Sequence, residues 1–386
     1  MAAPRFAFPF RPMVAETNVK GVLRFPRLPD GFNFNVASAT RLLRYGFPPR
    51  PSRRTSPRQH DAWKLRFPTG LELRTVTPML QLREKRRRPV YRTRFATDTP
   101  SDSQESANWA GCAVGGQIIS ALATWVIPNI YPSQMWDPST TSDGFQVSTW
   151  VGLGGGGPNS YQNPPVPAIL PNCTSLSIWQ AGVSQEVAAA NGPDCIFWFE
   201  WLPNPDASGE PDWAYEQYNV NGLSVQPGNE ISVYLLFVTI GDDIPEDNPD
   251  VPIEDPDLMF PTESGFYGLV NFINYTTSET VSYLVPEPPD VDPIGQCAEW
   301  ILERPTLPDG DTATLPLFGD VQFNHPGACV ITSVPGALKA SADIGSATLI
   351  DMFYNLLTNN PTLVAEPQID QAPDGSFFVR VYYKSS

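Results

Sequence analysis

Short apolar or alternating stretches recur along the chain from about residue 105 onward, separated by runs of Gly, Pro, Asn and Asp. Alternation of apolar and polar residues, and short apolar runs between turn residues, are typical of β-strands. We predict ten strands, over residues 117–126, 146–153, 175–183, 195–202, 231–240, 267–274, 280–285, 298–302, 317–323 and 376–384. Only 347–357 could form a helix, and its pattern suits a strand equally well. The chain is therefore expected to be all-β, an antiparallel sandwich or barrel.

The stretch 297–303 sets carboxylates among bulky apolar residues. Alternate side chains of a strand share a face, so Glu299 points away from Trp300 and Leu302. If these two residues pack into the core, Glu299 faces the floor of a groove or solvent. An exposed strand carboxylate would be the ordinary explanation, but Gln180 has a comparable setting among apolar neighbours.

Charge divides the chain into two parts. Residues 1–105 hold 21 of the 25 Lys and Arg and 8 of the 41 Asp and Glu, a net charge of +13, which leaves −29 for residues 106–386. Opposite charges of this size predict that the front part docks on the back part or binds something anionic; a disordered basic tail is the alternative. We expect residues 1–105 to be a basic, largely irregular segment that need not be part of the main fold, and residues 106–386 to be the acidic β domain.

Several kinds of chemistry are excluded by the residues present. His60 and His325 are the two histidines, and the chain has no Gly-x-Ser-x-Gly elbow, His-Glu-x-x-His pattern or phosphate-binding loop. The acidic run 242–257 lacks the spacing of a calcium loop. We therefore predict no cofactor and no metal site.

Membrane and nucleic-acid partners are not expected. No run of about eighteen apolar residues could cross a bilayer, and the first ten residues lack the apolar stretch of a signal peptide. The arginine cluster 86–88 has no aromatic stacking module behind it. Among the five cysteines, one bridge between Cys173 and Cys195 would be compatible with an oxidising compartment.

A set of short blocks resembles the ordered motifs of the glutamic peptidases, the eqolisins. Each block alone is weak evidence, but their order along residues 105–384 is specific. The blocks are Asn108-Trp109-Ala110-Gly111, Trp150-Val151-Gly152-Leu153, Trp179-Gln180-Ala181-Gly182-Val183, Trp198-Phe199-Glu200-Trp201-Leu202-Pro203, Ala298-Glu299-Trp300-Ile301-Leu302-Glu303 and Phe318-Gly319-Asp320-Val321-Gln322-Phe323.

The resemblance implies a concanavalin-A-like jelly roll, a two-sheet antiparallel β-sandwich whose concave sheet forms a substrate groove. It implies that Gln180 and Glu299 are the catalytic pair and that Trp150, Trp198 and Glu200 line the groove. The enzyme would be an extracellular, monomeric acid endopeptidase without a cofactor that cleaves proteins or peptides. Its basic N-terminal segment would be a removable propeptide and intramolecular inhibitor.

In that mechanism Glu299 acts as general base on water, and the amide of Gln180 donates hydrogen bonds to the oxyanion. The sequence departs from the family pattern at Gly154, where an Asp is usual. That departure keeps a second function open, an inactive sandwich that binds carbohydrate or peptide by stacking on Trp150, Trp179 and Trp198.

Overall fold

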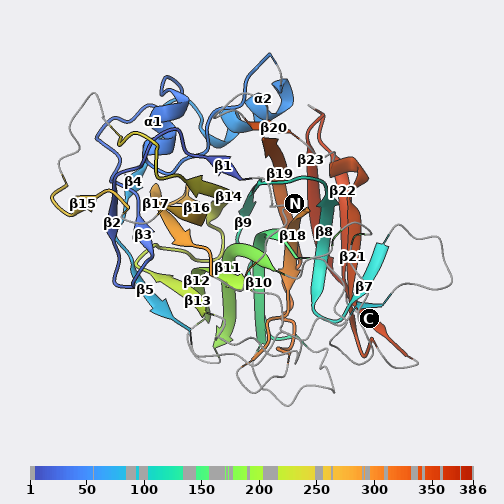
Figure 1. The fold of residues 1–386 in the computed structure, drawn as a ribbon. Coiled ribbons are helices and arrows are strands. Elements are labelled where there is room, and N and C mark those ends of the chain that lie inside the picture. The colour runs from blue at the N-terminus through green and yellow to red at the C-terminus, as the bar shows by residue number, and fades with distance from the viewer. Residues whose placement is uncertain are drawn as a thin grey trace.

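The computed structural model has strands in every part of the chain that it describes, from the N-terminal segment to residue 383 (Figure 1). The described residues are 5–54, 56–83, 93–94, 103–133, 145–155, 170, 173, 177–188, 192–202, 216–247, 255–261, 264–288, 291, 296–307, 312–331, 338–340, 344–356, 360–373 and 375–384. They fold into two β-sheets that face each other.

The first sheet carries the predicted site residues. Its neighbouring strands pair antiparallel, in the spatial order β5 (Met79–Leu82), β13 (Glu216–Asn221), β12 (Gly192–Leu202), β11 (Ile178–Ala188), β10 (Phe145–Gly154), β18 (Cys297–Glu303), β8 (Trp109–Gly115) and β21 (Thr348–Tyr354). Beyond β21, β7 (Ser103–Ser106) adds a parallel strand, and β6 (Thr93–Arg94) pairs with β7.

The second sheet has the order β17 (Glu279–Pro286), β16 (Gly265–Asn274), β14 (Glu230–Ile240), β9 (Ser120–Val126), β19 (Asp320–Ile331), β23 (Phe377–Tyr383) and β22 (Thr362–Gln371), again antiparallel. Strand β22 also pairs with β21, which joins the two sheets along one side. The short β20 (Leu338–Ala340) pairs with β19, and the 3-10 turn η1 spans Ile344–Ser346. The prediction of an all-β, two-sheet antiparallel sandwich is confirmed.

Large aromatic side chains fill the space between the sheets, and three tryptophans tie one sheet to the other. The indole N–H of Trp300 donates to the carbonyl of Leu122 at 2.9 Å, and that of Trp179 donates to the carbonyl of Leu269 at 3.3 Å. Trp125 donates to the hydroxyl of Thr149 at 3.0 Å. Buried indole groups with hydrogen-bond partners fix how one sheet lies over the other.

All ten predicted stretches overlap a strand, and 347–357 contains the strand β21. Several strands were not predicted, among them the longer strands β8, β13 and β22. Their sequences carry Gly, Asn, Gln or Pro, which obscure the apolar pattern.

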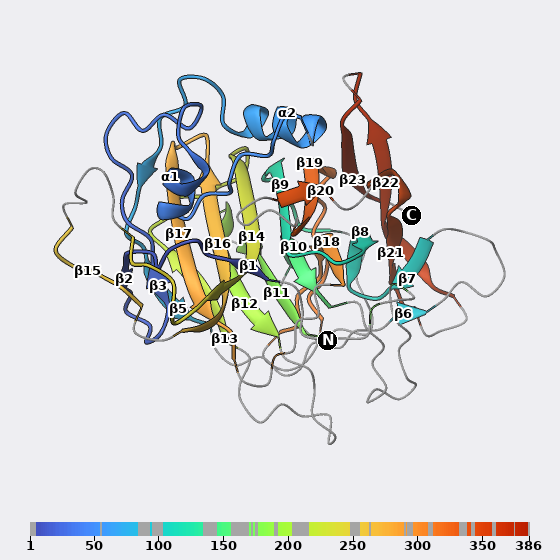
Figure 2. The same ribbon diagram turned by 45° about the horizontal axis from the view of Figure 1, so that its top comes forward.

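The N-terminal segment is part of the fold, which the sequence analysis had left open. Strand β1 (Phe6–Ala7) pairs parallel to β14, β3 (Leu23–Arg24) and β4 (Arg74–Thr75) pair with β17, and β5 extends the first sheet. Strand β2 (Val14–Glu16) pairs with β3 and with β15 (Leu258–Met259). The helices α1 (Ala39–Arg44) and α2 (Pro57–Arg66) complete this layer, which lies beside β14, β16 and β17 in Figures 1 and 2. Neither helix is long and apolar enough to cross a membrane.

The reason for this layer is the apolar outer face of the second sheet. Strand β14 is buried along nearly its whole length, and its outward residues Tyr234, Leu236 and Val238 pack against Phe6 and Phe8 of the N-terminal segment. Further along, a second aromatic cluster from the segment packs on Ile273 of β16; it contains Phe32, Phe34, Tyr45, Phe47, Trp63 and Phe67. Burying this surface stabilises the fold by about 25 cal/mol per Å² of apolar area.

Ion pairs add to this apolar contact. Arg5 pairs with Glu287 at 2.8 Å, Arg44 with Asp247 at 2.6 Å, and Arg74 with Glu279 at 2.7 Å. Arg24 also lies 3.8 Å from Asp255. In each pair the basic residue comes from the N-terminal segment and the acidic residue from the later part of the chain. The docking of the front part on the back part, expected from the charge division, is confirmed.

Candidate active site

Gln180 and Glu299 lie in one transverse row of the first sheet. Gln180 of β11 is directly opposite Gly152 of β10, and Gly152 is directly opposite Glu299 of β18. On the far side of Gln180 the row continues with Glu200 of β12. Opposed residues of antiparallel strands share a face, so the amide and the carboxyl group are on the same face. With two strand spacings between them, their Cα atoms are about 10 Å apart.

Gly152 is what leaves space between the two functional groups. A Cβ atom at this position would lie 2.8 Å from Cδ1 of Ile178, 2.8 Å from Cζ3 of Trp150 and 3.3 Å from Oε2 of Glu299. Any larger residue would therefore displace the surrounding side chains or fill the gap between amide and carboxyl. Sequence reasoning quoted Gly152 within a motif but did not assign it this role.

The amide of Gln180 is held in one orientation by Glu200. Its Nε2 donates to Oε1 of Glu200 at 2.6 Å, and both side chains are buried, at 3 % and 8 % exposure. The Oε1 atom of Gln180 is buried without a hydrogen-bond partner among the described residues. Because an amide nitrogen carries two hydrogens, one remains to donate to a ligand.

Glu299 is on the predicted face, but it is fully buried rather than facing an open groove or solvent. Its Oε2 has no hydrogen-bond partner in the described part of the chain, and its Oε1 is 3.7 Å from Sγ of Cys297. Burial, followed by the nearby Cys173 and Glu303, raises the pKa of Glu299 well above its ordinary value. In this arrangement burial favours the neutral carboxyl group over the carboxylate.

Trp150 and Trp198 lie on the same face as the pair, next to each other across Gly182. The indole N–H of Trp150 donates to Oε2 of Glu303 at 2.7 Å, and its ring packs edge-on against Trp109 with centroids 5.2 Å apart. A Cβ atom at Gly182 would come within 2.6 Å of Cβ of Trp150, so this glycine makes room for the ring.

The tryptophans do not form a stacking platform. Trp150 and Trp198 are buried at 0 % and 2 % exposure, and Trp179 lies on the opposite face of the sheet, in the core between the sheets. These three rings therefore cannot stack together on one sugar or peptide, as the alternative function would require.

The departure at Gly154 has a local cause. The residue has a φ of +85°, and a Cβ atom there would lie 2.5 Å from the carbonyl oxygen of Ser177. An Asp in this conformation would be strained and would collide with the backbone. The carbonyl of Gly154 instead accepts a hydrogen bond from the Cys297 thiol at 2.9 Å.

The suggested disulfide bond between Cys173 and Cys195 is not present in the structure. Cys173 and Cys195 are both free thiols, and so are Cys112 and Cys297. Cys195 lies 3.7 Å from Nε2 of Gln185 on the core side of β12, whereas Cys173 lies beside the start of β18. The sheet separates the two residues, so the expected bridge is wrong for this structure. No three His, Cys, Asp or Glu side chains of the described residues are grouped as a metal site.

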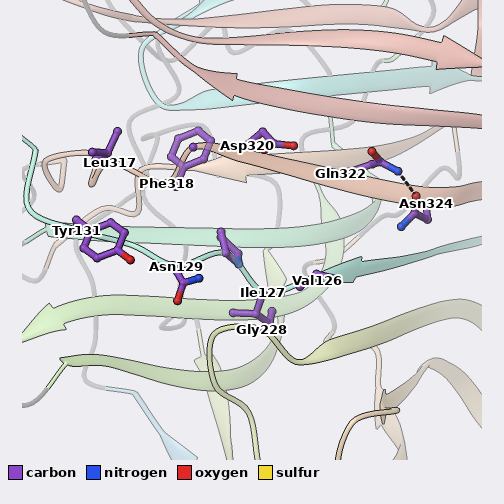
Figure 3. A pocket seen from close by; sticks show the side chains of 12 residues that line it. Val126, Ile127, Asn129, Tyr131, Gly228, Leu317, Phe318, Asp320, Gln322 and Asn324 are labelled. Atoms are coloured by element: carbon purple, nitrogen blue, oxygen red, sulfur yellow. Dashed lines mark hydrogen bonds between the residues drawn. The ribbon is translucent and has the colours of Figure 1, made fainter.

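An open groove of about 710 Å³ lies elsewhere, between the end of β9 and the start of β19 (Figure 3). The exposed Tyr131 and Leu317 line it, together with Asp320, Gln322 and Asn324 from alternate positions of β19. The residues between these positions lie in the core, so the groove opens on the outer face of the second sheet. It holds none of the predicted site residues.

The protein is an all-β sandwich in which an amide, that of Gln180, and a carboxyl group, that of Glu299, lie in one row on the same face of a sheet. Residues 107–238 match the model described as the Peptidase A4 family, so this part of the chain is similar to that family. The matched range contains Trp150, Gln180, Trp198 and Glu200 and ends before Glu299. No curated protein matches the chain.

Solved structures of glutamic peptidases are similar in part. A scytalido-glutamic peptidase with a transition state analog inhibitor is 16% identical with a TM-score of 0.43, and the match covers 72% of this chain and 98% of that one. SCP-B of the eqolisin family, in complex with the tripeptide Ala-Ile-His, is 15% identical with a TM-score of 0.43, and the match covers 72% of this chain and 98% of that one. Aspergilloglutamic peptidase from Aspergillus niger is 20% identical with a TM-score of 0.37, and the match covers 62% of this chain and 99% of that one.

Proposed function

We propose that the protein is a glutamic-type acid endopeptidase that hydrolyses peptide bonds with Gln180 and Glu299. The observation that carries the proposal is the row in which these two groups share a face with only Gly152 between them. A separation of about 10 Å between Cα atoms leaves both side chains able to reach one peptide group and one water molecule. Substrates are proteins or peptides, and no cofactor is required.

In the proposed reaction, Glu299 as carboxylate takes a proton from water while the water attacks the scissile carbonyl, and it then returns the proton to the leaving nitrogen. General acid–base catalysis of this kind contributes about 10²–10⁴-fold. The free N–H of Gln180 donates to the developing oxyanion, a contribution of about 3–4 kcal/mol per donor. Glu200 acts as a positioning residue, because it holds the amide through the 2.6 Å bond.

Glu299 must gain access to water before it can act as base. Its buried setting raises its pKa, so it would hold its proton at acidic pH in the closed arrangement. Entry of water and substrate removes the main cause of the shift, because a hydrated carboxylate is no longer penalised by burial. The protein is therefore expected to be inactive until the face that carries Glu299 is uncovered.

The decisive experiment is to incubate the protein with denatured substrate protein at pH 2–5 in the presence of pepstatin. Cleavage should persist in pepstatin, and it should be lost in Glu299→Gln and fall by about 100-fold in Gln180→Ala. The matched control is Gln146→Ala, an amide on the same strand as Gly152 and far along the face from the pair. Cleavage that survives in both site variants would leave Gln180 and Glu299 without a catalytic role.

The N-terminal segment is proposed as an intramolecular inhibitor. Its ion pair between Arg74 and Glu279 supports retention at neutral pH and weakening in acid, because hydrogen bonds outweigh burial and lower the pKa of Glu279. Its described residues cover the outer face of the second sheet and lie at both edges of the first, and they do not cover Gln180 or Glu299 directly.

The test for inhibition uses the full chain cut once by trypsin in the Arg-rich stretch 86–88. Size-exclusion chromatography at pH 7 should show the two fragments together, and at pH 3 it should show release coupled to a gain of cleavage activity. Equal retention and equal activity at both values would rule out an acid-released inhibitor. Secretion and a monomeric state, both implied by the resemblance, belong to the same proposal and are read from the medium and the elution volume.

A further inference from the structure

Two cysteine side chains meet beside Glu299. Sγ of Cys173 lies 3.8 Å from the carbonyl oxygen of Gln296, the residue bonded to Cys297. The Cys173 side chain therefore lies against the peptide group that leads into Cys297. Both are buried in the same apolar cluster as Trp150. Residues separated by more than a hundred positions are thus brought into contact on the site face.

The other described cysteine side chains cannot compete for this contact. Cys112 of β8 is opposite Trp300 and points into the core, and Cys195 occupies a core-side position of β12. Cys297 shares the site face with Glu299, as alternate residues of β18. The first sheet therefore stands between the pair and the other two thiols.

We propose that Cys173 and Cys297 form a disulfide bond when the chain folds in an oxidising medium. The bond would anchor residue 173 to the start of β18, two residues from Glu299. A cross-link between such distant positions restricts the unfolded chain strongly.

The chemistry balances with a small-molecule disulfide such as oxidised glutathione as the oxidant. The thiolate of one cysteine attacks that disulfide, forms a mixed disulfide and releases one glutathione thiolate. The second cysteine loses its proton to solvent, attacks the protein-bound sulfur and releases the second glutathione. Two protein thiols are oxidised to one S–S bond, and one glutathione disulfide is reduced to two thiols.

The burial of both cysteines determines when the disulfide bond can form. Exchange requires a thiolate, and both cysteines are shielded from solvent in the folded protein. The bond should therefore form during folding and should form slowly once the protein is folded. Its formation also removes the hydrogen that the Cys297 thiol directs at the Gly154 carbonyl, beside Glu299; this last consequence rests on the proposed function.

The test is to refold the full chain with reduced and oxidised glutathione, block free thiols with N-ethylmaleimide and map the linked peptides by mass spectrometry. The expected result is a peptide pair joined through Cys173 and Cys297, with Cys112 and Cys195 carrying the label. Cys195→Ser should retain the bond and Cys297→Ser should lose it. Maleimide on both Cys173 and Cys297, or a bond from Cys173 to Cys195, would overturn the proposal.

If refolding yields no folded protein, the chain produced in an oxidising secretory host is mapped in the same way, with the same two outcomes. Mapping does not use activity, so an inactive protein with the bond contradicts only the proposed function. An active protein without it contradicts only the disulfide. In an active protein, reduction should shift the acid limb of the pH profile, whereas the profile of Cys195→Ser should match that of the wild type.

Discussion

At the scale of single residues, the proposed site consists of two side chains, Gln180 and Glu299, and of a glycine between them that has no side chain. Gln180 and Glu299 were identified from the motifs that contain them, and the face of Glu299 followed from strand alternation. The space between them comes from Gly152, whose role shows only when the three strands are aligned. The sequence likewise shows a cysteine at position 297, but it does not show that the Cys297 thiol lies close to the Glu299 carboxyl group.

Replacing Gly152 by Ala should damage the site. The new Cβ would need Ile178 and Trp150 to move, because it would lie 2.8 Å from each. We expect a loss of stability of about 1–3 kcal/mol and a fall in kcat/KM of about 100-fold, measured by denaturant unfolding and by peptide cleavage. Gly115→Ala is the control, since its nearest contact would be 3.6 Å. Equal effects of the two substitutions would contradict the role of Gly152.

Glu299→Gln should stabilise the protein at neutral pH. The raised pKa of Glu299 means that the native state holds this proton in a range where the unfolded state has released it. Stability is then full below the ordinary carboxyl pKa and declines as pH rises toward the raised value. The melting temperature of the variant should exceed that of the wild type at pH 8, with the difference shrinking toward pH 4.

Differential scanning calorimetry over that pH range measures the effect. Glu186→Gln, which changes an exposed carboxylate of β11, should show no such pH-dependent difference. A wild type and a Glu299→Gln variant that melt together at every pH would show that the carboxyl group is hydrated in solution.

At the scale of elements, the strands were largely predictable because their signal is local. A strand with one buried face alternates, and a strand buried on both faces is apolar throughout, as β14 is. That continuous pattern already required a cover on the outer face of the second sheet. Phe6, Phe8 and Phe10 also alternate along the N-terminal segment, a strand-like signal that the high Pro and Arg content concealed.

Phe8→Ala should loosen the N-terminal layer. Phe8 is 1 % exposed and packs against Phe6, Phe10 and Phe25 with ring centroids 5.8–6.4 Å apart. Loss of a buried Phe costs about 3–5 kcal/mol, so we expect a lower melting temperature and faster tryptic cleavage of the segment. Val36→Ala, at a position that is 74 % exposed, should leave both unchanged. A segment that stays resistant in Phe8→Ala would indicate that ion pairs alone hold it.

At the scale of the whole molecule, charge and apolar surface act together to hold the basic segment on the acidic domain. Glu279 shows how pH affects the stability of this contact. Burial raises its pKa, but hydrogen bonds from Ser224, Thr277 and Arg74 outweigh this and lower the pKa below its ordinary value. The stabilisation is therefore present above the ordinary value and is lost as pH falls through the lowered one.

Acid should consequently weaken the edge where β4 meets β17. Hydrogen exchange of the amides of 71–80 should be faster at pH 3 than at pH 7 after correction for intrinsic rates, and Glu279→Gln should show the faster exchange already at pH 7. Glu230→Gln, at the exposed start of β14, is the control. Protection that is independent of pH in the wild type would argue against carboxylate-dependent docking.

By itself, the sequence determined the β class, the side of the strand to which Glu299 points, and the attraction between the two parts of the chain. These properties depend on period-two alternation and on summed charge, which need no knowledge of distant partners. Only the tertiary structure decided that the N-terminal segment is a layer of the fold, that Gly152 separates amide from carboxyl, and that Cys173 meets Cys297. Each of these results from strand register and packing between residues far apart in sequence, which local patterns do not encode.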